Sequence, residues 1–296
     1  MIQVLVDGLV NASFVALGVV GLSLVYNILG FPNFAQGDYV TAGGYFALVV
    51  VALFGTAGAI WGLTFGWPLI VAAGAAVALT VLLAALLDRT VFAPLRRRGA
   101  SRIALLMASF GVALMLRHLI LMFAGHDPAY YAFAIQPALA LGPVKVAINE
   151  LIVLGAAALA VFALHLLLTR TRLGKSMRAV AENPGLARVN GIDVDGVIAW
   201  TWAIGGALAA LAGVLFGLAV QLQPGFGFEL LLPMFAALIV GGVTNVYGAV
   251  IGAVLIGVAE SLCVRYFHPE YRQAVSFVAV MLVLMVRPQG LFGERA

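Results

Sequence analysis

Residues 68–87 read PLIVAAGAAVALTVLLAALL, with no charged side chain and a single hydroxyl group, that of Thr80. A helix of about 20 residues rises about 30 Å, the thickness of the hydrocarbon core of a bilayer. A surface helix of a soluble protein would carry polar residues on the face turned to water. This stretch therefore predicts a membrane-spanning α-helix.

The composition of the whole chain points to the same solvent. Of the 296 residues, 64% are hydrophobic and 9% are charged, and the mean hydropathy is +1.12. Soluble domains are about one quarter charged. A water-soluble fold cannot hide so much apolar surface, so lipid must cover part of it. We expect an all-α, polytopic transmembrane helical bundle that forms a single transmembrane domain, residues 1–296.

Further apolar runs set the number of spans. The regular runs are 4–29, 68–87, 103–123, 147–168 and 197–222. A run at 37–54 is short, and one at 230–262 is too long for one span and is interrupted by Gly241 and Gly242. A last run covers 271–286. Because backbone polar groups must be bonded internally in lipid, we expect about eight or nine spans, with short broken helices at 37–54 and within 230–262.

Broken helices at corresponding places in two halves of a chain are typical of transporter repeats. The segments 30–54 and 241–262 fit this pattern by their glycines, although their residues align poorly. The sequence thus gives a weak indication of an internal repeat.

Lysine and arginine set the expected orientation. They form two clusters, which comprise Arg89, Arg96, Arg97, Arg98 and Arg102, and Arg170, Arg172, Lys175, Arg178 and Arg188. Both loops are expected in the cytoplasm, and Arg287 and Arg295 place the C-terminus there as well. With about nine crossings, the N-terminus is then external. Four tryptophans are expected either at the membrane interfaces or in ordinary helix packing: Trp61, Trp67, Trp200 and Trp202.

The sequence contains no motif that indicates an enzyme active site. Gly174-Lys175-Ser176 matches the end of a phosphate-binding loop, but Thr169 stands where its first glycine belongs. Cys263 is the only cysteine and the four histidines are scattered, so no metal site is expected. The basic residues lie between apolar runs, which does not favour nucleic acid as a partner. We expect no catalysis, cofactor or metal.

Ionisable residues within spans are costly and therefore informative. They are Asp38, Arg117, Glu150, Glu229 and Glu260. All except Asp38 are near enough to a span end to reach the interface. Asp38 follows other polar residues beside a helix break, where capping of the next helix is its alternative role. We expect the solute pathway near Asn33, Gln36, Asp38, Gly241, Gly242 and Asn245.

The loop at 170–195 reads RTRLGKSMRAVAENPGLARVNGIDVD. Leu173, Met177 and Val180 fall on one helical face, which predicts a short amphipathic helix. Charged residues occupy the other face. Such a helix fits either a groove on a partner protein or a layer of lipid headgroups.

The second part of this loop is punctuated by turn residues. Asn183-Pro184 ends the amphipathic helix, because proline excludes helical geometry from the residue before it. A second short helix at 186–189 is expected to end at Asn190-Gly191. The two helices together predict a compact knob built to dock on another protein.

At this point the chain resembles the permease subunits of branched-chain amino acid ATP-binding cassette importers, over nearly its whole length. The strongest match is AVAENP at 179–184, with Ala187 and NGI at 190–192, which looks like the family's ATPase-coupling motif. Supporting matches are NFAQGD at 33–38, the glycines at 241, 242 and 248, and RPQGLFG at 287–293. Gln36 replaces an expected histidine and TNVY at 244–247 replaces smaller residues, which affects the solute rather than the transport role.

The resemblance implies a multi-pass permease of the bacterial inner membrane, for branched-chain amino acids or related small polar solutes such as amides and urea. Its implied partners are two cytoplasmic ATPase subunits, a second homologous permease and a periplasmic solute-binding protein. The implied ATPase-coupling residues are Leu173, Met177, Arg178, Ala181, Glu182, Asn183, Pro184, Ala187, Gly191 and Ile192.

Two other functions remain open from the residues. A stand-alone secondary transporter of amino acids would favour a buried carboxylate relay and would need no partner-shaped loop. A channel would favour a symmetric ring of polar residues lining a pore.

Overall fold

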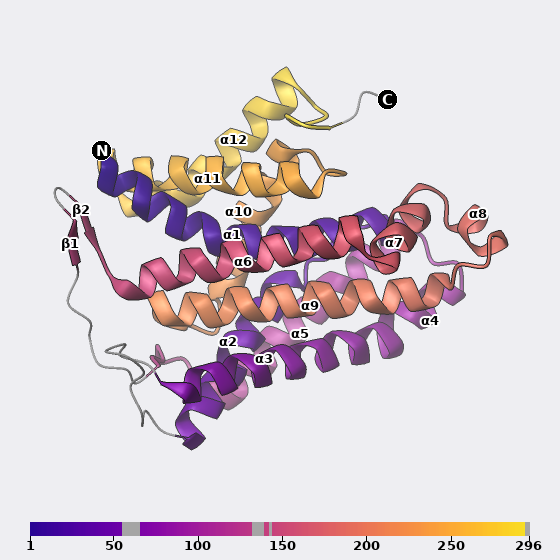
Figure 1. Cartoon of the computed structure of the whole chain (residues 1–296), viewed down its shortest axis with the longest axis horizontal. Helices are drawn as coiled ribbons and strands as arrows, with labels where there is room; N and C mark the ends of the chain where they lie inside the picture. The colour runs from indigo at the N-terminus through magenta and orange to yellow at the C-terminus, as the bar shows by residue number, and fades with distance from the viewer. Residues whose placement is uncertain (55–65, 132–138, 142–143, 294–296) are drawn as a thin grey trace.

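The computed structural model describes residues 1–54, 66–131, 139–141 and 144–293 as a bundle of long helices (Figure 1). The first half contains α1 (Ile2–Leu29), α2 (Gln36–Phe54), α3 (Trp67–Leu87), a π-helical turn η1 (Asp88–Phe92), α4 (Ala93–Arg97), α5 (Arg102–Ala124), β1 (Leu139–Leu141) and β2 (Val144–Val146). The second half contains α6 (Ile148–Arg170), α7 (Arg172–Glu182), α8 (Pro184–Val189), α9 (Val194–Ala219), α10 (Phe226–Gly241), α11 (Val246–Tyr266), a 3₁₀ turn η2 (Pro269–Tyr271) and α12 (Arg272–Val286).

The expected polytopic helical fold is confirmed. Within the described ranges, eight helical segments are long and apolar enough to cross a membrane, and α10 is a shorter apolar helix. Helices α5, α6 and α12 expose large apolar side chains, including Ile103, Leu159 and Met281, as a lipid-facing surface requires. The β1–β2 hairpin, paired from Leu139 to Val146, is an addition that the sequence did not predict.

The helix breaks differ in part from expectation. The run 230–262 divides into α10 and α11 as predicted, but 37–54 is unbroken within α2. The break precedes α2, where Gly30 ends α1 with a φ of 73°. From there the chain turns back into the bundle, and Phe34 N donates to Ser109 Oγ of α5 at 3.1 Å. Helix α2 therefore begins inside the bundle and not at its end.

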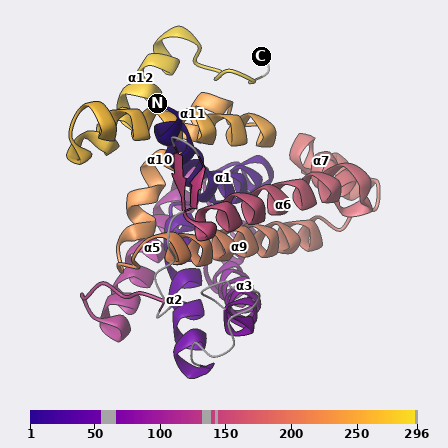
Figure 2. The same cartoon turned by 60° about the vertical axis from the view of Figure 1, so that its left-hand side comes forward.

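The bundle contains two groups of four helices that have the same arrangement but run in opposite directions. Helix α1 packs antiparallel to α11, and α9 packs antiparallel to α3, while α2 lies on α3 and α10 on α11 (Figures 1 and 2). Helix α5 adjoins α2 as α12 adjoins α10. The order α1, α2, α3, α5 thus corresponds to α9, α10, α11, α12, an inverted repeat. The matching breaks are 30–35 and 220–225, so the proposed match of 30–54 to 241–262 was wrong.

Tryptophan placement separates packing from interface positions. Trp202 is buried and stacks on Phe92 of η1 with ring centroids 4.9 Å apart, so an interfacial role for it was wrong. Trp200 and Trp67 are exposed on the surface of the bundle. Trp61 lies outside the described residues.

Candidate coupling surface and solute route

The amphipathic helix predicted in the 170–195 loop is α7. Thr171 caps its start, with Oγ1 accepting from Gly174 N at 3.1 Å. A side chain at Gly174 would collide with the carbonyl oxygen of Leu168, so glycine permits the close turn from α6 into α7. Met177 and Val180 are buried against the bundle. The apolar face thus fixes α7 onto the helix ends, and the polar face stays outside.

Asn183 ends α7 and starts α8, its Oδ1 accepting from Leu186 N at 3.0 Å. Helix α8 begins at Pro184, two residues earlier than predicted, because proline is favoured at the first helical position. Ile192 N donates to the carbonyl of Ala187 at 3.0 Å after Gly191 turns the chain with a φ of 78°. The loop therefore folds as two short helices joined at Asn183, the compact knob that was predicted.

The predicted coupling residues divide by exposure. Six lie open on the knob: Arg178, Ala181, Glu182, Asn183, Pro184 and Gly191. Met177 and Ala187 are buried, and Leu173 and Ile192 are partly buried, so these four position the knob. Sequence reasoning missed Leu186 and Val189, apolar side chains on α8 that are 60% and 85% exposed. Their apolar character within a polar loop was the available signal.

A cavity of about 540 Å³ lies behind α7. Its wall includes Arg178, Glu182 and Asn245, and so joins the coupling loop to the start of α11. Asn245 Oδ1 caps that helix by accepting from Tyr247 N and Gly248 N, each at 3.0 Å.

Gly241 and Gly242, two further residues of the predicted solute pathway, also belong to the packed break between α10 and α11. Gly241 packs against Gly248 so closely that a side chain would collide with its carbonyl oxygen. The C-terminal segment covers the break, with Leu291 N donating to Val240 O at 2.8 Å and Phe292 N to Gly241 O at 3.2 Å. Together with Asn245, these residues form the α10–α11 break beside the knob.

The remaining pathway residues lie deep in the bundle. Asn33 Oδ1 accepts from Ala35 N at 3.1 Å and shapes the turn before α2. Gln36 Nε2 reaches the carbonyl oxygens of Gly18 in α1 and Gly205 in α9, at 3.4 and 3.3 Å. Gln36 therefore ties the start of α2 to both neighbouring helices, separately from the α10–α11 break.

Asp38 lies beside Arg117, in the first turn of α2. Arg117 Nε is 3.5 Å from Asp38 Oδ1, and the two side chains are 17% and 1% exposed. The alternative role of Asp38 as a helix cap is wrong, since α2 starts at Gln36 and neither carboxylate oxygen has a hydrogen-bond partner within the described chain. The guanidinium carbon also lies 3.9 Å from the ring centre of Phe228 in α10. Each charge was visible in the sequence, but their pairing was not.

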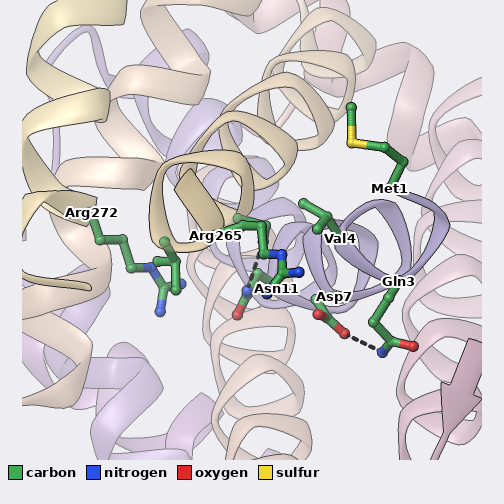
Figure 3. Close-up of a pocket in the computed structure, with 9 residues that line it drawn as sticks. Met1, Gln3, Val4, Asp7, Asn11, Arg265 and Arg272 are labelled. Carbon is green, nitrogen blue, oxygen red and sulfur yellow. Dashed lines mark hydrogen bonds between the residues drawn. The ribbon is translucent and has the colours of Figure 1, made fainter. Parts of the chain in front are cut away.

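A polar cavity of about 560 Å³ opens at the end of the bundle opposite the knob (Figure 3). Asp7 and Asn11 of α1, Arg265 of α11 and Arg272 of α12 line it. At its edge, buried Glu260 accepts from Arg272 Nε at 2.9 Å and from Ser276 Oγ at 2.8 Å. Glu260 is thus a fully bonded group of the fold and does not snorkel to the interface.

The long connection after α5 closes this same end. Ala129 pairs with Leu222 by backbone hydrogen bonds of 2.9 and 2.8 Å. Tyr131 inserts between the helices, and its hydroxyl donates to the Gly44 carbonyl at 3.0 Å. Burial raises the pKa of Tyr131, so the hydroxyl keeps the proton that it donates.

Comparison with known proteins agrees with this architecture. The family model described as the permease component of branched-chain amino acid transport systems matches residues 4–285. The chain belongs to this family. The permease is 31% identical over 303 residues to the high-affinity branched-chain amino acid transport permease BraD of Pseudomonas aeruginosa, covering 99% of this chain and 96% of that one. It is also 31% identical over 301 residues to LivH of Escherichia coli and to LivH of Salmonella typhimurium, with the same coverage. No solved structure matches it significantly.

Membership of this family decides between the functions left open above. The permease is a multi-pass component of a transport system and not an enzyme. The comparisons support the permease of an ATP-binding cassette importer, not the stand-alone secondary transporter.

Proposed function

We propose that the permease is one transmembrane domain of an inner-membrane importer and that its 170–195 loop is the cytoplasmic surface on which an ATPase docks. The observation that carries this proposal is the knob itself. Its buried Met177 and Ala187 fix it to the bundle, while Leu186 and Val189 expose apolar surface to water. Exposed apolar groups rimmed by polar residues are typical of surfaces that bind a protein or a membrane, and we assign this one to the ATPase.

The connections of the knob make it suited to transmit force. Helix α7 follows α6 after the single residue Thr171, and α9 follows α8 after a turn at 190–193. Helix α7 also packs against α1 and α9. When ATP-driven closure moves the docked knob, α1, α6 and α9 therefore move with it. Such a change of access requires two states that bind the partners differently.

The orientation follows from the knob. With 170–195 in the cytoplasm, α4 with its arginines and the segment 287–293 lie on that side, and the start of α1 faces the periplasm (Figure 1). The polar cavity at Asp7 and Arg265 then opens where a periplasmic solute-binding protein would deliver its cargo.

We assign a second homologous permease and two ATPase subunits as the other partners. Helices α5 and α10 present one open apolar face, on which Phe110 and Phe228 are 43% and 47% exposed. A related permease facing this surface would enclose a path between the subunits. Its solutes would be the branched-chain amino acids named for the relatives.

The solute route is proposed at Asn33, Gln36 and Asp38, where α2 starts inside the bundle. Gly241, Gly242 and Asn245 are assigned to the hinge between α10 and α11, next to the cavity behind α7. The inner helix break then lies within reach of the coupling knob.

The docking proposal is tested with the complete transporter in proteoliposomes. Glu182→Lys and Gly191→Trp should abolish ATP hydrolysis stimulated by loaded binding protein, with insertion unchanged. Arg89→Glu, a charge reversal at an exposed site of η1 outside the 170–195 loop, is the matched control and should retain stimulation. Normal stimulation in both loop variants would remove the docking role.

A further inference from the structure

The Asp38–Arg117 pair is incomplete as a salt bridge. Charge-assisted contacts between nitrogen and carboxylate oxygen are about 2.7–2.9 Å long, whereas this one is 3.5 Å. Asp38 Oδ1 and Oδ2 and Arg117 Nε are buried without a hydrogen-bond partner in the part of the chain that the structure describes. Glu260, in contrast, has both carboxylate oxygens bonded. Buried polar atoms in native proteins are nearly always bonded, so the free capacity beside α2 points to a ligand.

Helical spacing builds two layers at this place. Arg117 lies two turns beyond Phe110 on the same face of α5, and Phe228 lies two turns before Phe235 on α10. Two turns span about 10 Å. The layer farther from the knob therefore holds Asp38, Arg117 and Phe228.

The layer nearer the knob is aromatic. Phe34, one turn before Asp38, contacts Phe110 with ring centroids 6.0 Å apart and Phe235 with centroids 5.0 Å apart. Phe110 is partly open to the α5–α10 face. A polar layer therefore lies next to an apolar one.

We infer that these layers form a binding subsite for a zwitterionic α-amino acid with an apolar side chain. The ammonium group binds Asp38, the carboxylate binds the guanidinium fork of Arg117, and the side chain lies against Phe34, Phe110 and Phe235. The inference rests on the proposed route at Asp38, and it adds Arg117, Phe34, Phe110 and Phe235 to that route as the residues that recognise the solute.

Charge balance supports this assignment. When a zwitterion separates Asp38 from Arg117, its ammonium group compensates Asp38 and its carboxylate compensates Arg117. No charge is then left without a counter-charge within the bilayer. A neutral amide or urea offers no such exchange, and its insertion would leave both ions without a counter-charge. Asp38 and Arg117 therefore pair with each other when the site is empty, and each pairs with the opposite charge of the solute when it is bound.

The test measures leucine taken up per ATP hydrolysed, in proteoliposomes that hold the complete transporter with its binding protein. Arg117→Lys, which keeps the charge but loses the two-pronged geometry, and the double variant Asp38→Asn with Arg117→Gln should each lower this ratio about tenfold. Stimulation of ATP hydrolysis by loaded binding protein should persist. The double variant carries no unpaired charge, so it separates loss of binding from loss of folding, which elution from a gel-filtration column in detergent also reports.

A matched control is Arg89→Gln, a neutralised arginine on the exposed surface of η1. It should keep the wild-type ratio. If both Arg117→Lys and the double variant keep that ratio as well, the subsite assignment is wrong although ATPase docking stands. If wild-type ATP hydrolysis does not respond to loaded binding protein, the importer proposal fails and not the subsite alone.

Discussion

Gly37 of α2 and Gly227 of α10 contact each other backbone to backbone at the centre of the inverted repeat. A Cβ on either glycine would collide with the carbonyl oxygen of the other. Thr41 Oγ1 fastens the crossing by accepting from Gly227 N at 3.1 Å. Gly21 of α1 also faces Gly205 of α9, less tightly, since a Cβ on Gly21 would lie 3.1 Å from the Gly205 carbonyl oxygen and one on Gly205 would lie 3.5 Å from that of Gly21. The two halves thus meet along small residues, as membrane helices do where backbones must come close.

Gly37→Leu should therefore destabilise the permease strongly. Overpacking of a tight contact costs roughly 1–3 kcal/mol, and here the obstacle is backbone that cannot turn aside. We expect a clear fall in the midpoint of thermal unfolding in detergent, together with a lower yield of folded protein. Gly74→Leu, at a position of α3 with open space around it, is the control and should unfold like the wild type. Equal midpoints for the two variants would contradict a packed crossing.

Leu186 and Val189 should contribute to the affinity of the permease for the ATPase but not to the stability of its fold. A buried interface anchor contributes about 1 kcal/mol or more when it is truncated. Leu186→Ser should therefore raise the Kd for the purified ATPase at least about fivefold, while the unfolding midpoint stays unchanged because the side chain is exposed. Leu186→Met keeps the apolar surface and should bind normally. An unaltered Kd for Leu186→Ser would remove α8 from the docking surface.

The sequence alone was enough to predict the features that depend on a local pattern of residues. Apolar runs gave the long helices, and the spacing of Leu173, Met177 and Val180 gave α7, because a helix face repeats within a few residues. It was insufficient where distant segments meet. The proximity of Asp38 to Arg117 and the matching of α2 with α10 depend on tertiary packing, which no short window of sequence contains.

Polar residues near a helix break were also ambiguous in the sequence. Asn245 and Asp38 each follow a glycine-containing break, yet Asn245 caps α11 whereas Asp38 lies within the first turn of α2. The difference is where the helix starts, and helix starts are set by the fold as much as by the cap.

Asn245→Ala should thus cost stability more than transport. Loss of a cap that bonds Tyr247 N and Gly248 N costs about 0.5–2 kcal/mol. The unfolding midpoint is expected to fall, while leucine taken up per ATP remains near the wild-type value. Asn245→Asp keeps an accepting oxygen and should restore the midpoint. A transport loss in Asn245→Asp with the cap intact would give the amide a direct role on the solute route.

The bonded pair of Glu260 and Arg272 should respond to mutation differently from Asp38 and Arg117. Removing one partner of a fully buried pair costs about 3–5 kcal/mol, because the remaining charge is left without compensation. Arg272 is 38% exposed and water screens part of this cost, so Arg272→Met is expected to destabilise by about 2 kcal/mol. The second change Glu260→Met should recover most of it, since it removes the stranded carboxylate. Chemical or thermal unfolding of the single and double variants measures this coupling. Asp38→Asn with Arg117→Gln should cost less than Glu260→Gln with Arg272→Gln, because neither double variant strands a charge, and the Asp38 carboxylate gives up no hydrogen bond to described residues whereas the Glu260 carboxylate gives up two. The opposite ranking would mean that Asp38 and Arg117 hold the fold together and are not poised to separate.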